Sequence, residues 1–521
     1  MPDGAMNRRR WPAVFVLAAL ARPSYGDWKS DVGYTALRAR LQEATPTGAN
    51  VAVTQVEAAA SGGAYLPDRT NPQFAGKTIQ SRSGESGASS HATTVAAYWY
   101  GLTESLAPAV NQIDAWAATA WLQEALNFPA GVPIAETRRV QNHSWVGTWQ
   151  SSTYDTLTLR RVDLLVERDG VVVVAGVNNG AGSAIPRLIA HAYNVLSVGL
   201  TSGASSYGPT VLEMAGRVKP DLVAPAGQTS WAAPMVASAS ALLLESADSA
   251  GILPEMSANQ RRAAEAVLVK SCLMAGATKD EFVDWRRGFA SPSADGSVPL
   301  DYRYGAGELN VDNSHRILTA GRQPASTAAR VALTGWDYES VGAGASRSYY
   351  FDVPEFHYLQ QLSILVAWNR HVAVSYAGGP VFNPSLANID MHLYRSDGWA
   401  LGPLVDRSVS ALDNVEHIYL RHLPAGGYVF RITSDATASY AVAWDARVSA
   451  AVGVDINGDG RVNGTELEAF TACAAGPGIA PLPGCAFWDT DRDGDVDQSD
   501  FGKLQACFGD KPDGSPMGCG S

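Results

Sequence analysis

No stretch of the 521-residue sequence reaches the roughly 18–20 consecutive apolar residues that a membrane-spanning helix requires. Positive charge is also scarce, because 39 Lys and Arg stand against 51 Asp and Glu and give a net charge of −12 at pH 7. The first shortage argues against a membrane span, and the second argues against nucleic acid as a partner. Hydrophobic residues still make up 46% of the chain and charged residues 17%, a balance typical of folded proteins.

The N-terminus has the composition of an export signal. Three arginines at 8–10 precede an apolar run over residues 11–20, and Gly26 follows at a position suited to cleavage. The pattern predicts a signal peptide over residues 1–26 and a secreted or cell-surface protein. The alternative is an uncleaved, frayed tail.

Cysteine is sparse, with five in the chain, and four of these lie in the C-terminal tail. The tail repeats itself with a shift of 34 residues, which places Cys473 on Cys507 and Cys485 on Cys519. Export makes disulfides chemically reasonable there. The shared spacing favours the bridges Cys473–Cys485 and Cys507–Cys519 among three possible connectivities. The fifth cysteine, Cys272, lies in an apolar stretch and is expected to be a small buried hydrophobe.

Residues 27–322 alternate β-rich and helical patterns. Continuous apolar runs at 51–53 and 171–174 are typical of strands buried on both faces of a parallel sheet. Residues 234–244 and 258–275 have the pattern of helices. The alternation predicts an α/β domain, a parallel sheet with helices on both of its faces.

The strongest local pattern surrounds Ser230. Residues 227–234 read Gly-Gln-Thr-Ser-Trp-Ala-Ala-Pro and come just before the first predicted helix. A Ser at a loop-to-helix junction exposes its hydroxyl, and backbone N–H groups beside it face a developing oxyanion. The string resembles the nucleophile segment of subtilisin-like serine proteases, peptidase family S8, usually Gly-Thr-Ser-x-Ala-x-Pro. The resemblance implies that Ser230 is a nucleophile; the alternative is an ordinary helix N-cap.

Two further segments resemble the same family. Residues 89–96 read Ser-Ser-His-Ala-Thr-Thr-Val-Ala, like the segment of the catalytic histidine, which implies that His91 is the base that a hydroxyl nucleophile needs. Residues 175–180 read Ala-Gly-Val-Asn-Asn-Gly, like the family strand that ends in Ala-Gly-Asn-x-Gly, which implies that Asn178 lies in the oxyanion hole. Taken alone, Asn-Asn-Gly is also a common turn after a buried strand.

The acid of the triad is the least obvious member. In the family an Asp ends the first strand, in a Val-Ile-Asp-x-Gly context, whereas residues 51–58 read Val-Ala-Val-Thr-Gln-Val-Glu-Ala. Simple registration puts Gln55 in place of the Asp, and a shift of two residues puts Glu57 there on the same strand face. We select Glu57, because Gln cannot carry the charge that stabilises an imidazolium. If Glu57 is instead an ordinary strand-end residue, the acid is absent or supplied elsewhere.

The order acid, His, Ser along the chain matches that of subtilisin and differs from those of chymotrypsin and the α/β-hydrolases. Residues 140–147 resemble the family's substrate-binding strand, on which an extended peptide adds as a further strand. No cofactor is expected for catalysis. The expected substrate-binding residues are Ser144, Trp145, Val146 and Gly147.

The pattern changes over residues 323–448, where short alternating strands are separated by turn residues such as Asp397-Gly398. This texture predicts an all-β sandwich. Residues 388–394 and 423–428 resemble the pre-peptidase C-terminal or P-domain type of sandwich, which follows secreted bacterial proteases as a stabilising or binding module. The predicted strands are 347–353, 362–368, 389–394, 418–423, 428–433 and 440–444.

The last part, residues 449–521, contains two acidic 12-residue loops, 455–466 and 489–500. Both place oxygen ligands at positions 1, 3, 5, 9 and 12, a backbone carbonyl at position 7 and Gly at position 6, which is the EF-hand calcium scheme. The duplicated pattern resembles helical dockerin-type modules, which implies a docking partner at the cell surface; the alternative is a disordered acidic tail. The predicted Ca²⁺ ligands are Asp455, Asn457, Asp459, Arg461, Asn463 and Glu466 in the first loop, and Asp489, Asp491, Asp493, Asp495, Asp497 and Asp500 in the second.

Together these resemblances imply a secreted serine endopeptidase that acts on a protein or peptide substrate. Two alternatives stay open. One is a catalytically silent, calcium-dependent cell-surface binding protein on the same scaffold, and the other is a sedolisin-like acid peptidase with a carboxylate base. A third, an esterase on an α/β-hydrolase fold, lacks the Gly-x-Ser-x-Gly elbow.

Overall fold

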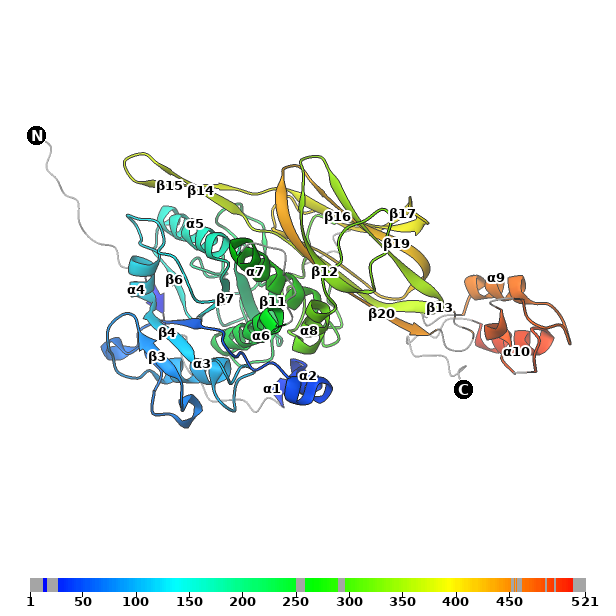
Figure 1. Ribbon diagram of the computed structural model, residues 1–521, viewed down its shortest axis with the longest axis horizontal. Helices are drawn as coiled ribbons and strands as arrows, with labels where there is room; N and C mark the ends of the chain where they lie inside the picture. Colours follow the sequence, from blue (N-terminus) through cyan, green and yellow to red (C-terminus); the bar gives the residue numbers. More distant parts are fainter. Residues whose placement is uncertain are drawn as a thin grey trace, which may run out of the picture.

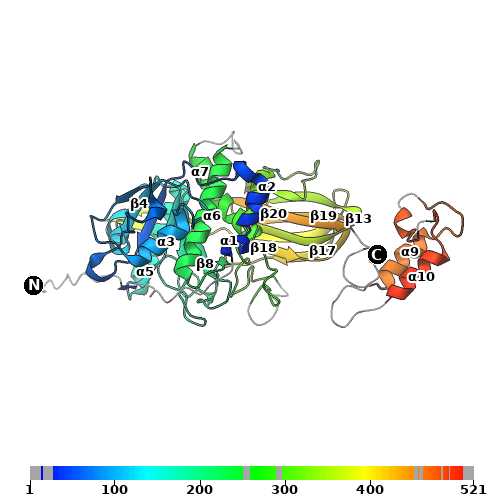
Figure 2. The ribbon, with the colours of Figure 1, turned by 90° about the horizontal axis from the view of Figure 1, so that it is seen from below.

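A computed structural model describes residues 13–15, 27–249, 258–288, 296–450, 454, 456, 462–482, 485–491 and 493–508. An α/β part, an antiparallel β part and a small helical module follow one another along the chain and along the long axis of the molecule (Figure 1, Figure 2). Of the helices in these ranges, none has both the length and the apolar character needed to cross a membrane. Apart from 13–15, the predicted signal peptide lies outside the described residues.

Seven parallel strands form the central sheet of the α/β part, in the order β11-β8-β7-β5-β2-β4-β3. Val172 and Val174 pack into the core on one face of the sheet, and Val173 and Ala175 pack into the core on the other. This two-sided burial confirms the predicted parallel sheet. The strands are β2 Val53–Glu57, β3 Thr78–Ser81, β4 Gln112–Ala117, β5 Val140–His143, β7 Val172–Gly176, β8 Leu196–Leu200 and β11 Leu222–Ala224.

Helices cover both faces of this sheet. Helices α3 (Ser90–Tyr100) and α6 (Thr229–Ser249) pack together on one face, and α5 (Ser152–Asp169) covers the other. Helix α6 begins before the predicted start at residue 234, so Ser230 lies in its first turn. The other helical elements of this part are α1 Trp28–Asp31, α2 Tyr34–Leu41, η1 Gln42–Ala44, η2 Ser61–Gly63, η3 Pro72–Phe74, α4 Ala118–Ala120, η4 Trp121–Ala125, α7 Ala258–Ala275 and α8 Val311–Thr319.

The antiparallel part is a seven-stranded sheet that folds over on itself, in the order β12-β20-β13-β19-β16-β17 with β18 paired to β13. The first half of β13 (Ser346–Ala367) pairs with β19, and its second half pairs with β20 and β18, so β13 passes from one layer to the other. The predicted strands 347–353 and 362–368 are therefore two halves of one strand. The remaining strands are β12 Thr334–Val341, β16 Ile389–Asp397, β17 Ala400–Ser408, β18 Val415–Leu420, β19 Leu423–Ser434 and β20 Ala438–Ala450.

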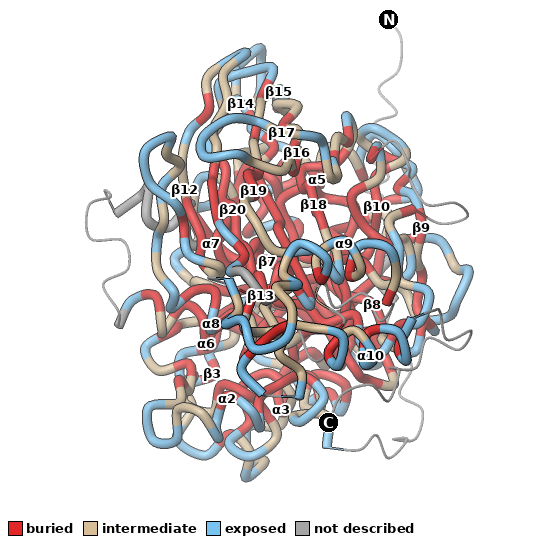
Figure 3. Tube along the Cα trace, turned by 90° about the vertical axis from the view of Figure 1, so that its right-hand side faces the viewer, coloured by how far each residue is buried: buried red, intermediate tan, exposed pale blue. Residues whose placement is uncertain are grey.

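The layer that contains β20 is buried on both faces (Figure 3). Val442 and Trp444 pack into the core of the sandwich, whereas the small side chains of Ala441 and Ala443 join the core that contains α7. A hairpin of β14 (His371–Tyr376) and β15 (Pro380–Ser385), which the sequence pattern did not predict, lies along α5 (Figure 1). Its Val372 and Phe382 pack with Leu164 of α5.

Two short strand pairs complete the α/β part. The strand β1 (Ala13–Phe15) pairs with β6 (Val146–Thr148), and β9 (Gly208–Pro209) pairs with β10 (Val218–Lys219); both pairs are antiparallel.

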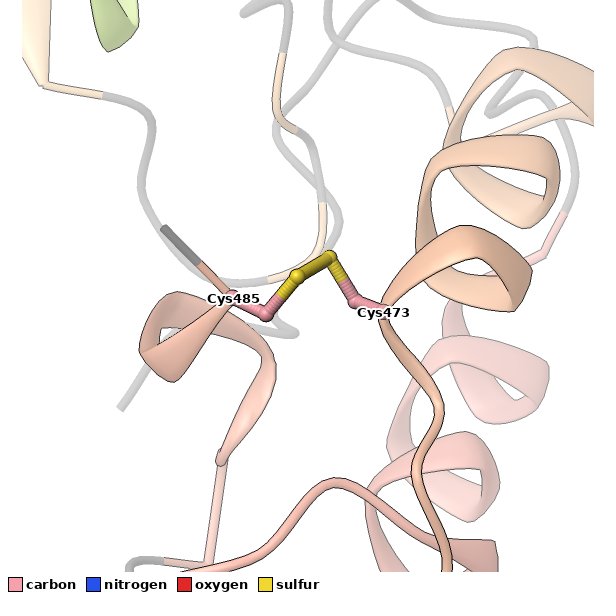
Figure 4. The surroundings of a disulfide bond; sticks show 2 residues. All are labelled: Cys473 and Cys485. Carbon is pink, nitrogen blue, oxygen red and sulfur yellow. A yellow bond between two sulfur atoms is a disulfide. The ribbon is translucent and has the colours of Figure 1, made fainter. Parts of the chain in front are cut away.

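The tail module contains α9 (Gly464–Cys473), η5 (Ala486–Trp488) and α10 (Gln498–Cys507), which enclose a small core around Phe470, Trp488 and Leu504. The predicted bridge Cys473–Cys485 is present (Figure 4). Cys507 is also disulfide-bonded, and its predicted partner, Cys519, lies outside the described residues. Cys272 is a buried free cysteine, as expected.

Candidate active site

Glu57 and His91 form a buried pair at the carboxyl end of β2. Glu57 is the last residue of β2, and His91 lies in the first turn of α3, where Ser89 Oγ accepts a hydrogen bond from Ala92 N. His91 Nδ1 and Glu57 Oε2 are 2.8 Å apart, with side-chain exposures of 7% and 1%. Burial by itself lowers the pKa of His91, but the charge of Glu57 and its hydrogen bond outweigh burial, so the pKa of His91 lies above its usual value of 6.5.

The other ring nitrogen of His91 and the hydroxyl of Ser230 are both buried. Neither His91 Nε2 nor Ser230 Oγ has a hydrogen-bond partner in the described part of the chain. Buried polar atoms without partners are uncommon and call for an explanation. Helices α3 and α6 pack together, and Tyr98 of α3 stacks on Trp231 of α6 with ring centroids 6.2 Å apart. The imidazole and the hydroxyl therefore lie on two helices that contact each other.

Polar contacts from two neighbouring strands anchor the start of α6. Asn179 Oδ1 accepts hydrogen bonds from the backbone N and the Oγ1 of Thr229, at 2.9 and 3.1 Å. Ser144 Oγ donates to the backbone oxygen of Ser230 at 2.9 Å. A Cβ on Gly176 would come within 3.1 Å of Thr229 O, so glycine at the end of β7 lets the helix approach closely. These contacts fix the backbone that carries the Ser230 hydroxyl.

The two consecutive asparagines after β7 have different surroundings. The amide of Asn179 holds Thr229, whereas the side chain of Asn178 makes no hydrogen bond to any other described residue. The backbone of Asn178 is fixed by Ser206, whose Oγ accepts from Asn178 N at 2.9 Å and whose N donates to Asn178 O at 2.8 Å. A half-buried amide on a fixed backbone is thus available to a bound ligand, and the role of Asn178 in an oxyanion hole stays a prediction.

Comparison with known proteins identifies the α/β part. The model of the subtilase family matches residues 109–307. The chain contains a subtilase-family domain. Ser230, Asn178 and residues 144–147 lie inside the matched range, whereas Glu57 and His91 precede it. Subtilases are serine peptidases, which act on protein or peptide substrates.

The subtilase domain is also similar to several solved structures. The prenylagaramide maturation protease PagA is 19% identical, the match covers 55% of this chain and 99% of that chain, and the TM-score is 0.36. The patellamide maturation protease PatA is 19% identical, the match covers 53% of this chain and 98% of that chain, and the TM-score is 0.34. A cold adapted subtilisin-like serine proteinase is 16% identical, the match covers 51% of this chain and 90% of that chain, and the TM-score is 0.32. No curated protein matches the chain.

The predicted substrate-binding residues of the subtilase domain have different surroundings. Ser144 uses its hydroxyl to hold Ser230, and the side chain of Trp145 is 1% exposed in the core under α5. The backbone of β6 pairs with an extended segment, with Val14 opposite Gly147 and Phe15 opposite Val146. The binding of an extended peptide at residues 144–147 stays a prediction.

Sequence reasoning missed three buried polar residues, Gln55, Tyr100 and Asn142, near the candidate site. Gln55, rejected as the acid, donates from Nε2 to Glu57 Oε1 at 2.9 Å, and Tyr100 donates to Gln55 Oε1. Asn142 donates to Ser144 Oγ at 2.9 Å. A glutamine in a strand that also carries the proposed acid was the signal for Gln55, but its partners depend on how β2 packs against α3.

The acidic loops of the tail are described only in part. Asp455, Asn457, Asp459 and Arg461 of the first loop lie outside the described residues, and Asn463 with Glu466 forms a capping box at the start of α9. In the second loop, the carboxylates of Asp489, Asp491 and Asp493 lie within 4.8 Å of one another, and so do those of Asp495, Asp497 and Asp500. Asp495 Oδ1 is buried and makes no hydrogen bond within the described part of the tail. Crowded oxygens of this kind fit a hard cation.

Proposed function

We propose that the subtilase domain is a serine endopeptidase in which Ser230 is the nucleophile, His91 the base, Glu57 the orienting acid and Asn178 an oxyanion-hole donor. The observation that carries the proposal is the buried Glu57–His91 pair, 2.8 Å apart, together with the unpaired Nε2 of His91 and Oγ of Ser230. A base oriented by a carboxylate on its far side, and a hydroxyl on the helix packed against it, are the parts that nucleophilic acyl transfer requires.

The residues supply each step of peptide hydrolysis. Ser230 Oγ attacks the scissile carbonyl carbon while its proton passes to His91 Nε2, and Glu57 stabilises the resulting imidazolium. The Asn178 amide and the Ser230 backbone N–H donate to the oxyanion. The C–N bond then breaks as His91 returns the proton to the leaving amine. Water, activated by His91, hydrolyses the acyl-enzyme and frees Ser230.

Covalent labelling of the full chain tests this proposal. A fluorophosphonate probe is expected to label Ser230 stoichiometrically in the native protein, and to label neither Ser230→Ala nor heat-unfolded protein. Peptide hydrolysis is expected to disappear in parallel with labelling. A native chain that is neither labelled nor active would overturn the proposal and favour the silent calcium-dependent binding protein.

The pH profile separates a subtilase mechanism from an acid peptidase. Since the pKa of His91 is raised above 6.5, kcat/KM is expected to decrease as the pH falls through a midpoint above 6.5, because the protonated base cannot accept the serine proton. Activity measured from pH 4 to 9 gives this midpoint. A maximum below about pH 5 would contradict it and favour a carboxylate base.

The export signal and the tail support a location outside the cytoplasm, and we include secretion or cell-surface attachment in the proposal. N-terminal sequencing of the protein recovered from the medium or the cell envelope of an expressing host tests it. The expected start is residue 27, directly after Gly26. A protein retained inside the cell with its first residues intact would contradict it.

We also propose that the two tail loops bind calcium and present α9 and α10 to a docking partner at the cell surface. The residues that would hold the ions are those of the two 12-residue loops, with backbone oxygens at Arg461 and Asp495. The clustered carboxylates of the second loop support it. A bound Ca²⁺ would neutralise the repulsion among these carboxylates and stabilise the module.

Calcium titration tests the tail. Calorimetry on full-length protein freed of metal with a chelator is expected to show two Ca²⁺ per chain. The double change Asp491→Ala and Asp493→Ala is expected to remove one, whereas Glu468→Ala, an exposed carboxylate on α9 outside the loops, is expected to leave both. Absence of binding at millimolar Ca²⁺, or two ions retained in the double variant, would refute the assignment. Binding of the protein to cells, measured with and without Ca²⁺, tests the docking. Binding is expected to require Ca²⁺ and to be lost when the chain is truncated at residue 449.

A further inference from the structure

Gln55 connects the strand that carries the triad acid to the helix that carries the base. Its side chain is 1% exposed. Gln55 Nε2 donates to Glu57 Oε1 at 2.9 Å and to the backbone oxygen of Ala92 at 3.0 Å, and Gln55 Oε1 accepts from the hydroxyl of Tyr100. Ala92 follows His91 in the first turn of α3, and Tyr100 is the last residue of that helix. One amide therefore holds β2 to both ends of α3.

The partners of Gln55 determine which way its amide points. A backbone carbonyl oxygen only accepts hydrogen bonds, so the atom that faces Ala92 O has to be the amide nitrogen. That orientation turns Oε1 towards Tyr100, which then has to donate. The remaining N–H of Gln55 reaches Glu57 Oε1, while Glu57 Oε2 faces His91 Nδ1. Both oxygens of the carboxylate are thus held, one by Gln55 and one by His91.

A glutamate in this position needs such a second contact. It has one more rotatable bond than the aspartate usual at the end of the first strand in this family, so its carboxylate has more ways to turn from the imidazole. On the basis of the proposed triad, we propose that Gln55 is a positioning residue that holds Glu57 Oε2 towards His91. Tyr100 supports it by fixing the amide. Neither residue contacts substrate in this role.

The charged groups around this cluster are few. Glu57 on β2 and His91 on α3 form the ion pair, and the hydroxyl of Tyr100 donates to Gln55 Oε1. Burial and the charge of Glu57 raise the pKa of Tyr100 well above its usual value, and the charge of Arg69 opposes this. Tyr100 therefore stays protonated and remains a donor throughout the range in which the imidazole titrates.

Gln55→Leu tests the positioning role. Loss of a hydrogen bond to a charged group is expected to lower kcat about 10- to 100-fold with KM changed less than about threefold. A carboxylate free to turn away also pairs less with His91, so the acid limb of the pH profile is expected to shift downward by about half a unit or more. A role in packing alone would leave the midpoint unchanged, and a role in sharing the charge of Glu57 would shift it upward; either result would overturn the proposal.

Gln141→Leu is the matched control. Gln141 is a fully buried glutamine on the adjacent strand β5, bonded to Glu136 and His143 and not to the triad. Its replacement is expected to lower the melting temperature about as much as Gln55→Leu while leaving the midpoint of the acid limb unchanged. If Gln141→Leu moves the midpoint as Gln55→Leu does, the effect belongs to general destabilisation and the positioning role is refuted.

Two further variants keep the test sharp if Gln55→Leu folds poorly. Gln55→Glu can still donate to Glu57 while the introduced carboxyl is protonated, so it is expected to be more active than Gln55→Leu at low pH and to lose this advantage as the pH rises. Tyr100→Phe is expected to lower kcat about two- to tenfold and to shift the midpoint in the same direction as Gln55→Leu. Identical profiles for Gln55→Glu and Gln55→Leu at every pH would refute the proposal.

An NMR titration of the His91 imidazole separates this proposal from the proposed function. It reports the pKa of His91 whether or not the enzyme turns over. If the native chain is inert towards the fluorophosphonate but Gln55→Leu still lowers the pKa of His91, the peptidase assignment fails and the positioning of Glu57 stands. If the native chain is labelled and active but the pKa of His91 is the same in Gln55→Leu, the peptidase assignment stands and the positioning role of Gln55 is refuted.

Discussion

Glu57→Gln is expected to lower kcat about 10⁴-fold while leaving the fold intact. The change keeps the size of the side chain but removes the charge that stabilises the imidazolium, and an amide nitrogen facing Nδ1 selects the wrong tautomer of His91. Removal of the triad carboxylate in other serine proteases costs about this much. Steady-state kinetics on a peptide substrate, with circular dichroism to check folding, measures the effect.

Glu136→Gln is a suitable control for this variant. Glu136 is a half-buried carboxylate that accepts from Thr54 of β2 and from Gln141. The same chemical change there is expected to leave kcat within about threefold of the native value. If Glu57→Gln retains near-native turnover, the acid has been placed wrongly and His91 is oriented by another group.

Ser230 and His91, which we propose as nucleophile and base, were accessible to sequence reasoning because each lies in a short, local pattern. Ser230 starts a helix after a Gly-Gln-Thr string, and His91 starts another after a capping serine. Selecting Glu57 as the proposed acid required one more step, because Gln55 and Glu57 lie on the same face of β2 and only the need for a negative charge separates them. The fold class followed from apolar runs and helical periodicity in the same way.

The contacts between these segments were not accessible. Whether Gln55 meets Glu57, or Asn179 meets Thr229, depends on the register of strands and helices that are far apart in the sequence. The same limit applies to β13, which was predicted as two strands because its passage between layers has no local signature. The hairpin of β14 and β15 forms a separate two-stranded sheet that packs against α5, so residues more than 200 positions away help to stabilise it.

That hairpin begins at Arg370, and Arg370→Met is expected to lower the free energy of unfolding by about 3–5 kcal/mol. Arg370 is 4% exposed and forms ion pairs with Asp163 of α5 and with Glu213, whose side chains are 0% and 6% exposed. Its backbone also exchanges hydrogen bonds with the side chain of Asn194. Removing the guanidinium leaves the fully buried carboxylate of Asp163 without a charge partner, whereas Glu213 keeps its ion pair with Arg160. An unpaired buried charge is strongly destabilising.

Because Arg370 supplies the positive charge for these carboxylates, we expect the sandwich and the subtilase domain to unfold together. Chemical denaturation followed by tryptophan fluorescence measures the loss. Arg330→Met is the control, since Arg330 pairs with Asp352 on the surface of the same sandwich, at side-chain exposures of 33% and 46%, and exposed pairs contribute about 0–1 kcal/mol. A loss below about 1 kcal/mol in Arg370→Met, or a single-domain fragment ending at residue 322 with native stability, would show that the two parts fold independently. A cooperative, single transition in the native chain that splits or shifts in Arg370→Met would show that the peptidase fold depends on the sandwich behind it.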